Sequence, residues 1–198
     1  MLTFKEQAFF CEENIERVQH FIKAKNNPAR LCEIPPSFIV MDLTWKCNYH
    51  CRGCIDKEAV NQHGVPNPPV DIIEDIFRYC YEYKVRGIMT MGGEVFLHKK
   101  GIQKALEKSI EYSIPLKTVT NGSCLHNYLN QITEAFTIPG SNLRVSINAS
   151  QQNYYMQVNK KINLQMILDN IQTLTSRKTY VSVSTVAFPE VSESAGLL

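Results

Sequence analysis

Three cysteines on one short stretch place the strongest constraint on this chain. Cys47, Cys51 and Cys54 stand in a C-x3-C-x2-C spacing within the segment MDLTWKCNYHCRGCID, residues 41–56. Three thiolates on one loop can hold three irons of a cubane 4Fe-4S cluster, and one iron then stays open to a ligand from outside the protein. An open iron is a site for chemistry, so the spacing predicts a reactive centre.

Zinc is the main alternative to a cluster. Zinc also binds clustered cysteines, and His50 or His63 could complete a closed Cys3His site. Structural zinc sites usually come as two half-sites, however, and no second C-x2-C or H-x3-H follows in the sequence. Plain reduced thiols are a weaker interpretation, because three of the seven cysteines fall within eight positions. The spacing therefore favours a cluster while leaving zinc open.

A short apolar run leads into the cysteine loop. Residues 38–41 (FIVM) follow Pro35-Pro36 and are partly β-branched, which predicts a buried strand that delivers the loop at its carboxyl end. In parallel α/β folds this end of a strand carries the active site.

A second apolar strand is predicted at 87–91, and it stops at Gly92-Gly93-Glu94. Two glycines at a strand end let the backbone approach a ligand closely, and the carboxylate can accept a hydrogen bond from an ammonium group. Taken alone, the triplet is better explained as a glycine turn with a solvated glutamate. Its position favours a functional role, because neighbouring parallel strands would place this turn and the cysteine loop on the same rim.

The remaining pattern alternates between helices and strands. Helices are predicted at 5–25, 71–84, 102–112, 128–136 and 162–176, and further strands at 115–120, 143–148 and 180–188. Such alternation demands a parallel sheet with right-handed crossovers, and five strands do not close a barrel. The predicted fold class is therefore α/β, a partial (βα) TIM-like barrel with a curved parallel sheet of five to six strands, preceded by an N-terminal helix.

Apolar spacing also predicts which faces are buried. Val18 and Ile22 belong to an apolar stripe expected to pack the first helix on the domain, while Ile72 and Leu168 are expected on the buried faces of two later helices. On the fourth strand, the expectation is that Ser146 and Asn148 share one face and Val145 and Ile147 the other.

Length and charge bound the class of protein. The chain has 198 residues and a net charge of +2 with no long basic run, which gives no argument for nucleic-acid or membrane binding. Its N-terminus lacks the pattern of a signal peptide, and an odd number of cysteines fits a reducing cytoplasm better than a disulfide framework. The predicted organisation is an N-terminal helical flank at 1–35, a core at 36–190 and a tail at 191–198.

With these motifs in register, the chain resembles the core of radical S-adenosylmethionine (radical SAM) enzymes over about residues 36–190. The C-x3-C-x2-C loop after the first strand is the signature of that family, and Gly92-Gly93-Glu94 matches its GGE motif after the second strand. The segments of the predicted fourth and fifth strands also fall where the SAM-contacting residues of that family lie. Three matches in register are more specific than any one, and they make zinc a remote alternative.

The resemblance implies an iron-sulfur and SAM chemistry. Cys47, Cys51 and Cys54 would ligate three irons of a 4Fe-4S cluster, and the amino and carboxylate groups of SAM would chelate the fourth. One electron, from a donor such as flavodoxin or ferredoxin, would cleave SAM to a 5′-deoxyadenosyl radical that abstracts a hydrogen atom from a C-H bond.

The resemblance also implies residues that contact SAM. Glu94 and the backbone near Gly92 and Gly93 would hold its amino group through a charge-assisted contact. Ser146 and Asn148 would be candidates for contacts with the SAM carboxylate or ribose.

Several positions depart from the family pattern. The residue before the third cysteine, commonly an aromatic that lies against adenine, is Gly53, so that contact is absent or comes from a residue such as Tyr49. Val95 replaces a frequent proline, and Asn148 replaces a frequent aspartate. Cys124 is the last cysteine, so no auxiliary cluster follows within this chain.

A sixth strand is also missing from the pattern, which keeps a second functional class open. The chain could be a truncated, non-catalytic module that binds the cluster and SAM, or an enzyme whose open sheet edge is covered by a partner chain. Peptide or protein modification is the first expectation for the substrate, by fold-level resemblance. Cys124, Tyr154 and Tyr155 lie in rim segments, but no hydrogen donor is assigned among them.

Overall fold

A five-stranded parallel sheet forms the centre of the protein. The computed structural model describes residues 12–24, 27, 34–51, 54, 56, 60, 66–148 and 163–186. The strands are paired in the order of the chain, and each neighbouring pair is parallel: β1 (Ile39–Thr44), β2 (Ile88–Gly92), β3 (Leu116–Thr120), β4 (Asn142–Ser146) and β5 (Val181–Ser184). The predicted α/β class and parallel sheet are confirmed.

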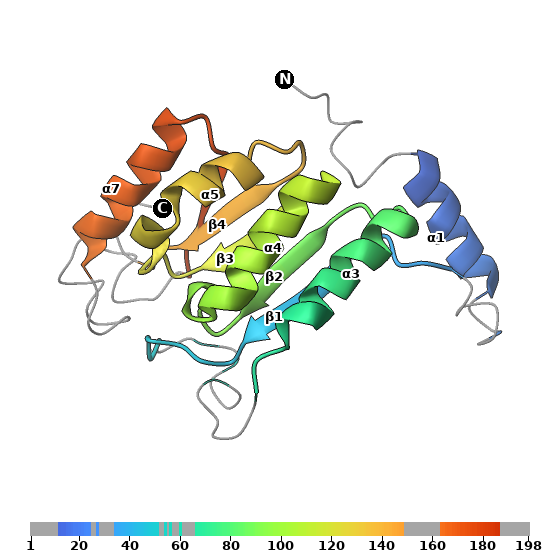
Figure 1. Cartoon of the computed structure of the whole chain (residues 1–198), viewed down its shortest axis with the longest axis horizontal. Coiled ribbons are helices and arrows are strands. Elements are labelled where there is room, and N and C mark those ends of the chain that lie inside the picture. Colours follow the sequence, from blue (N-terminus) through green and yellow to red (C-terminus); the bar gives the residue numbers. More distant parts are fainter. Residues whose placement is uncertain are drawn as a thin grey trace.

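Four helices cover one face of this sheet (Figure 1). They are the crossovers that parallel pairing requires, and the sheet order is consistent with a regular winding in one direction. Their bounds are α3 (Val70–Glu82), α4 (Lys99–Tyr112), α5 (Leu129–Ala135) and α7 (Leu164–Ser176). Two short 3-10 helices, η1 (Val95–Leu97) and η2 (Leu125–Asn127), follow β2 and β3.

Alternation along the strands decides which side chains are buried. Ile88, Leu116 and Leu143 point to the helix-bearing face and are fully buried. Val40, on the other face of β1, is 57% exposed, so the prediction of a wholly buried first strand was wrong. The sheet buries one face against the helices, and the alternating residues of β1 do not share that cover.

Two helix residues expected in the core are also exposed. Ile72 is 46% exposed and Leu168 is 40% exposed, whereas their neighbours Ile73 and Ile167 are fully buried. Successive residues of a helix point about 100° apart, so two neighbouring residues cannot both face the sheet. The apolar stripe of each helix is therefore wider than the strip of residues that contacts the sheet.

The N-terminal helix α1 (Glu12–Ala24) lies beside the end of α3 at the β1 edge (Figure 1). Arg17 joins the two, because its guanidinium donates to the carbonyl oxygens of Pro36 at 3.2 Å and of Tyr83 and Lys84 at 2.9 Å. These last two carbonyls follow α3, where backbone acceptors lack helical partners. Val18 and Ile22 are exposed, so the expectation that these two residues pack on the domain was wrong.

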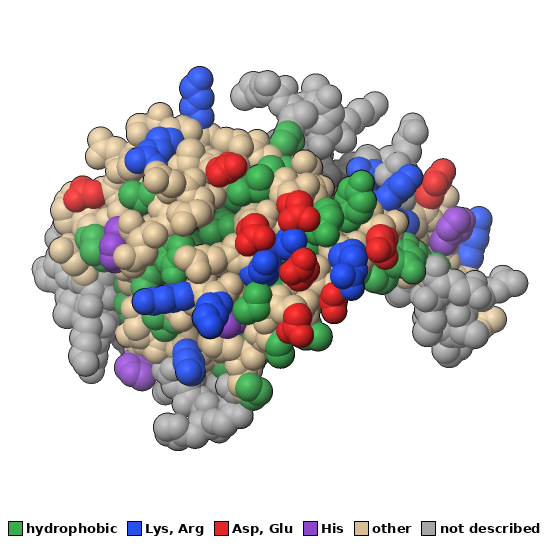
Figure 2. Space-filling model, viewed as in Figure 1, with side chains coloured by type: hydrophobic (Ala, Val, Ile, Leu, Met, Phe, Trp, Pro, Cys, Tyr) green, Lys and Arg blue, Asp and Glu red, His purple; other side chains and the backbone are tan. Residues whose placement is uncertain are grey.

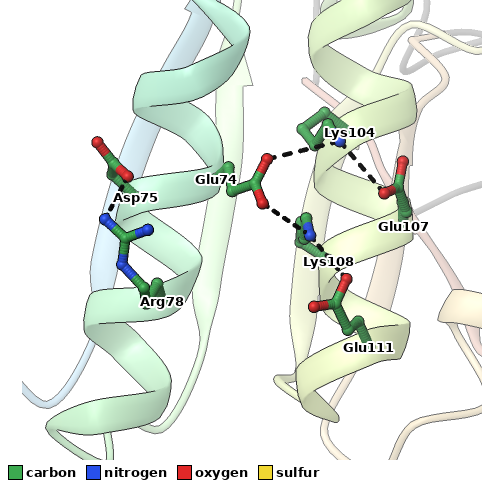
Figure 3. A network of polar contacts seen from close by, with 7 residues as sticks. All are labelled: Glu74, Asp75, Arg78, Lys104, Glu107, Lys108 and Glu111. Atoms are coloured by element: carbon green, nitrogen blue, oxygen red, sulfur yellow. Dashed lines mark hydrogen bonds and ion pairs between the residues drawn. The ribbon is translucent and has the colours of Figure 1, made fainter.

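A polar network joins the outer surfaces of α3 and α4 (Figure 3). The Lys108 ammonium contacts Glu74 at 2.9 Å and Glu111 at 2.7 Å, and Lys104 contacts Glu107 at 3.2 Å. The hydrogen bond from Lys108 lowers the pKa of Glu74, and those to Glu111 and Glu74 raise the pKa of Lys108. In Figure 2, acidic and basic side chains gather over these helices.

Among the described helices, none is long and apolar enough to cross a membrane.

Replacing Phe77 by alanine tests the packing of α3 on the sheet. Phe77 is fully buried, and its truncation should lower the free energy of unfolding by about 3–5 kcal/mol. Ile72→Ala on the same helix is the matched control and should cost about 1 kcal/mol or less. Equal losses for the two variants in urea unfolding would contradict the assigned buried face.

The Glu74 carboxylate should make stability depend on pH. Its folded-state pKa is lowered by Lys108, so its contribution is present above the unfolded-state pKa of about 4.3 and is lost as the pH falls through the folded value. Glu74→Gln should therefore be less stable than the wild type at neutral pH, and the difference should close in acid. Asp75→Asn, which removes an exposed pair with Arg78, is the control and should show a smaller difference at neutral pH.

Candidate cofactor site

The cysteine loop leaves the carboxyl end of β1. Cys47, Cys51 and Cys54 are partly buried and form no disulfide, and the Cys54 N–H donates to the Cys51 carbonyl at 3.3 Å. Burial raises the pKa of Cys47, the hydrogen bond from the Tyr49 N–H opposes this, and negative charge on Glu94 and Cys54 adds to the rise.

The backbone of the GGE segment is joined to the start of this loop. The Gly93 N–H donates to the Thr44 carbonyl at 2.6 Å, and the Glu94 N–H donates to the Lys46 carbonyl at 2.8 Å. A Cβ on Gly92 would overlap the Thr44 carbonyl oxygen, and one on Gly93 would overlap that of Lys46. Gly92 also has a φ of +122°, which disfavours other residues. Both glycines thus allow a close approach of the cysteine loop itself.

The Glu94 carboxylate is completely buried, with 0% of the residue exposed. It accepts hydrogen bonds from the Phe96 N–H at 3.1 Å, the Thr120 hydroxyl at 2.7 Å and the Asn121 N–H at 2.7 Å. Burial raises its pKa, and the three donors oppose that rise. The carboxylate therefore ties the end of β2 to the end of β3, and it is not the solvated glutamate that an isolated glycine turn would have.

The turn after β3 reaches the cysteine loop from a second side. The Asn121 amide nitrogen donates to Asn48 Oδ1 at 2.9 Å and lies 3.9 Å from Cys47 Sγ. The Asn48 amide nitrogen in turn donates to the Ser123 hydroxyl at 2.9 Å. The sequence assigned no contact with the cysteine loop to Asn121. Adjacent polar residues after the third predicted strand were the available signal for this role.

A third segment also contacts the start of the loop. The Thr44 hydroxyl donates to Asn67 Oδ1 at 2.7 Å and accepts from the Lys46 N–H at 3.1 Å. Next to Asn67, the Pro68 carbonyl lies 3.2 Å from His98 Nε2, just beyond η1. The sequence assigned no role to Asn67, because its partner is distant in the chain.

Comparison with protein families identifies the chain. The model of the radical SAM superfamily matches residues 41–195, which is most of the sequence. This chain belongs to the radical SAM superfamily.

Known proteins agree with this membership. A GTP 3',8-cyclase from Campylobacter fetus subsp. fetus (strain 82-40) is 23% identical over 162 residues, 79% of this chain and 48% of that protein. Streptococcus suis SuiB bound to S-adenosylmethionine superposes with a TM-score of 0.68 at 15% identity, over 91% of this chain and 40% of SuiB. A structure described as anSMEcpe with bound AdoMet gives 0.58 at 15% identity, over 75% of this chain and 43% of that chain. These structures confirm the partial-barrel fold.

The chain spans about half the length of the curated relative that it matches. SuiB has also been solved bound to the precursor peptide SuiA, and that structure superposes equally well, with a TM-score of 0.68.

The cofactors characteristic of radical SAM proteins are SAM and a 4Fe-4S cluster. The donor set fits the cluster, because three partly buried thiols follow β1 on one loop and Cys47 accepts an N–H hydrogen bond from Tyr49 at 3.4 Å. In the parts of the chain that the structure describes, no three His, Cys, Asp or Glu side chains are gathered as for one metal ion. A cubane cluster does not require three side chains to meet at one metal ion, since each cysteine binds a different iron of the cluster.

The other predicted site residues lie at the ends of β2 and β4. Gly92 and Gly93 are partly exposed, whereas Glu94 is fully buried and already accepts three hydrogen bonds. The Ser146 hydroxyl lies 3.4 Å from that of Ser184, and Asn148 Oδ1 accepts from the Val186 N–H at 3.2 Å. These five SAM contacts stay predictions.

Other residues discussed from the sequence have clear outcomes or fall outside the described ranges. Tyr49, suggested for adenine, is buried in the core and presents no exposed ring face. Cys124 is partly buried beside the Ser123 hydroxyl at 3.6 Å. His50 is exposed. The residues outside the described ranges are Gly53, His63, Tyr154 and Tyr155.

Replacing Glu94 by glutamine tests whether its buried hydrogen bonds stabilise the fold. Glutamine has one acceptor oxygen, so at least one of the three donors would face an NH2 group instead. The free energy of unfolding should fall by about 1–3 kcal/mol. Glu107→Gln, on the exposed surface of α4, is the control and should change stability little. An unchanged urea midpoint for Glu94→Gln would contradict this stabilising role of the Glu94 hydrogen bonds.

Proposed function

We propose that this chain is the SAM-cleaving core of a radical SAM enzyme. In this proposal Cys47, Cys51 and Cys54 hold a 4Fe-4S cluster, and the backbone of Gly92 and Gly93 meets the SAM amino group. The observation that carries the proposal is the attachment of the cysteine loop to the GGE segment through two backbone hydrogen bonds. That attachment supports the proposal because it holds the start of the cysteine loop, next to Cys47, against Gly93 and Glu94.

The chemistry of the proposed cofactors is a reductive cleavage of SAM that yields a 5′-deoxyadenosyl radical for hydrogen abstraction. This chain's residues orient the groups involved. The Cys47 sulfur, a proposed iron ligand, is partly buried and accepts a hydrogen bond from the Tyr49 N–H. The Glu94 carboxylate supplies negative charge beneath the glycines, a setting that favours an ammonium group near them. Ser146 and Asn148 would approach the carboxylate or ribose from β4.

For the substrate, we propose a peptide or protein. The support is limited to the fold shared with SuiB, which binds the precursor peptide SuiA. An external one-electron donor such as flavodoxin or ferredoxin is required by the proposed chemistry. A partner chain or further segment covering the β5 edge is part of the same proposal, because β5 is the last strand of the described sheet.

Anaerobic reconstitution with iron and sulfide tests this function. The wild-type chain should take up about four irons, and SAM should change the low-temperature EPR spectrum of the reduced protein. Addition of dithionite and SAM should release 5′-deoxyadenosine, measured by chromatography. Cys51→Ala should abolish the signal. Cys80→Ala is the matched control, because burial in α3 raises the pKa of this thiol to about 12 and keeps it protonated.

Each other outcome has a definite meaning. One tightly bound zinc and no cluster would overturn the proposal in favour of a structural site. A cluster whose EPR spectrum responds to SAM, without release of 5′-deoxyadenosine, would identify a non-catalytic binding module. A cluster that persists in Cys51→Ala would contradict the assigned ligands.

A further inference from the structure

The side chain of Asn121 is held in one orientation beside the cysteine loop. Its Oδ1 accepts from the Ser123 N–H at 3.0 Å. A backbone N–H can only donate, so this contact fixes which end of the amide is oxygen and which is nitrogen. The NH2 group must then face Asn48 Oδ1 at 2.9 Å and Cys47 Sγ at 3.9 Å.

The backbone of the same residue is fixed as well. The Asn121 N–H donates to the buried Glu94 carboxylate at 2.7 Å, and Asn121 is 9% exposed. Asn48 is held in the matching orientation, because its own NH2 donates to the Ser123 hydroxyl. Asn121 therefore presents an N–H donor to Cys47 from a rigid, largely buried position.

Two N–H groups lie beside the Cys47 sulfur. They come from the Asn121 amide at 3.9 Å and from the Tyr49 backbone at 3.4 Å. The Asn121 backbone N–H also donates to Glu94, so this one residue joins the buried carboxylate to the sulfur.

We propose that Asn121 is a positioning residue whose amide donates to the Cys47 sulfur and raises the reduction potential of the cluster bound there. This inference rests on the proposed function. Reduction adds one electron from an external donor, without breaking a bond, and the added negative charge spreads onto the cysteine sulfurs. An N–H dipole aimed at one sulfur stabilises the reduced state more than the oxidised state.

The test is a redox titration of the reconstituted protein followed by EPR. Asn121→Asp keeps an oxygen for the Ser123 N–H and replaces the NH2 donor by a second oxygen. At the wild-type midpoint potential, its ratio of reduced to oxidised cluster should fall at least about tenfold, which is about 59 mV for a one-electron couple. Asn121→Ala should shift the midpoint in the same direction by less, because it removes the donor without adding charge. Asn130→Asp, at an exposed position on α5, makes the same charge change and should leave the midpoint unchanged.

Iron counts separate this inference from a merely structural role and from the proposed function. A full iron complement with an unchanged midpoint in both Asn121 variants would overturn the inference. Loss of iron, with an unchanged midpoint for the clusters that remain, would also overturn it by assigning Asn121 a structural role alone. Absence of a cluster in the wild type would instead refute the proposed function.

Discussion

The close approach of two backbone segments is the constraint on which the rest of the site depends. The carbonyl groups of Thr44 and Lys46 accept hydrogen bonds from the N–H groups of Gly93 and Glu94. The two segments lie so close that a Cβ on Gly92 or Gly93 would overlap one of these carbonyls. Parallel strands can share a rim without touching beyond their last pair. Here the pairing of β1 and β2 continues past the strands, after a register shift between Asp42 and Thr44, and carries the cysteine loop onto the GGE segment.

A buried carboxylate extends this junction to a third strand. Glu94 would be costly to bury without partners, and its three donors come from η1 and from the end of β3. Asn121 then continues the contacts back to the cysteine loop. Hydrogen bonds thus join three segments that are far apart in the sequence into a network around Cys47. This network explains why polar residues are buried here at the edge of an apolar core.

The parts of this structure that depend on local pattern could be predicted from the sequence. Periodicity indicated the described strands and α-helices but neither of the 3-10 helices η1 and η2. The cysteine spacing with the GGE triplet indicated the family. Exposure at Val40 and Ile72 could not be predicted, because it depends on which face of the sheet the helices cover. The roles of Asn48 and Asn121 were also missed, since their hydrogen bond spans 73 residues and has no periodic signature.

The hydrogen-bond network around Cys47 also has a consequence for how such a protein would acquire its cofactor. Because hydrogen bonds join the loop start to the ends of β2 and β3, much of its conformational entropy is lost during folding. Assembly of a cluster on Cys47 would then order little additional backbone at this ligand. Preorganisation of this kind increases affinity by lowering the entropic cost of binding. Under the proposed function, iron and sulfide would therefore bind the folded chain more favourably than the unfolded chain.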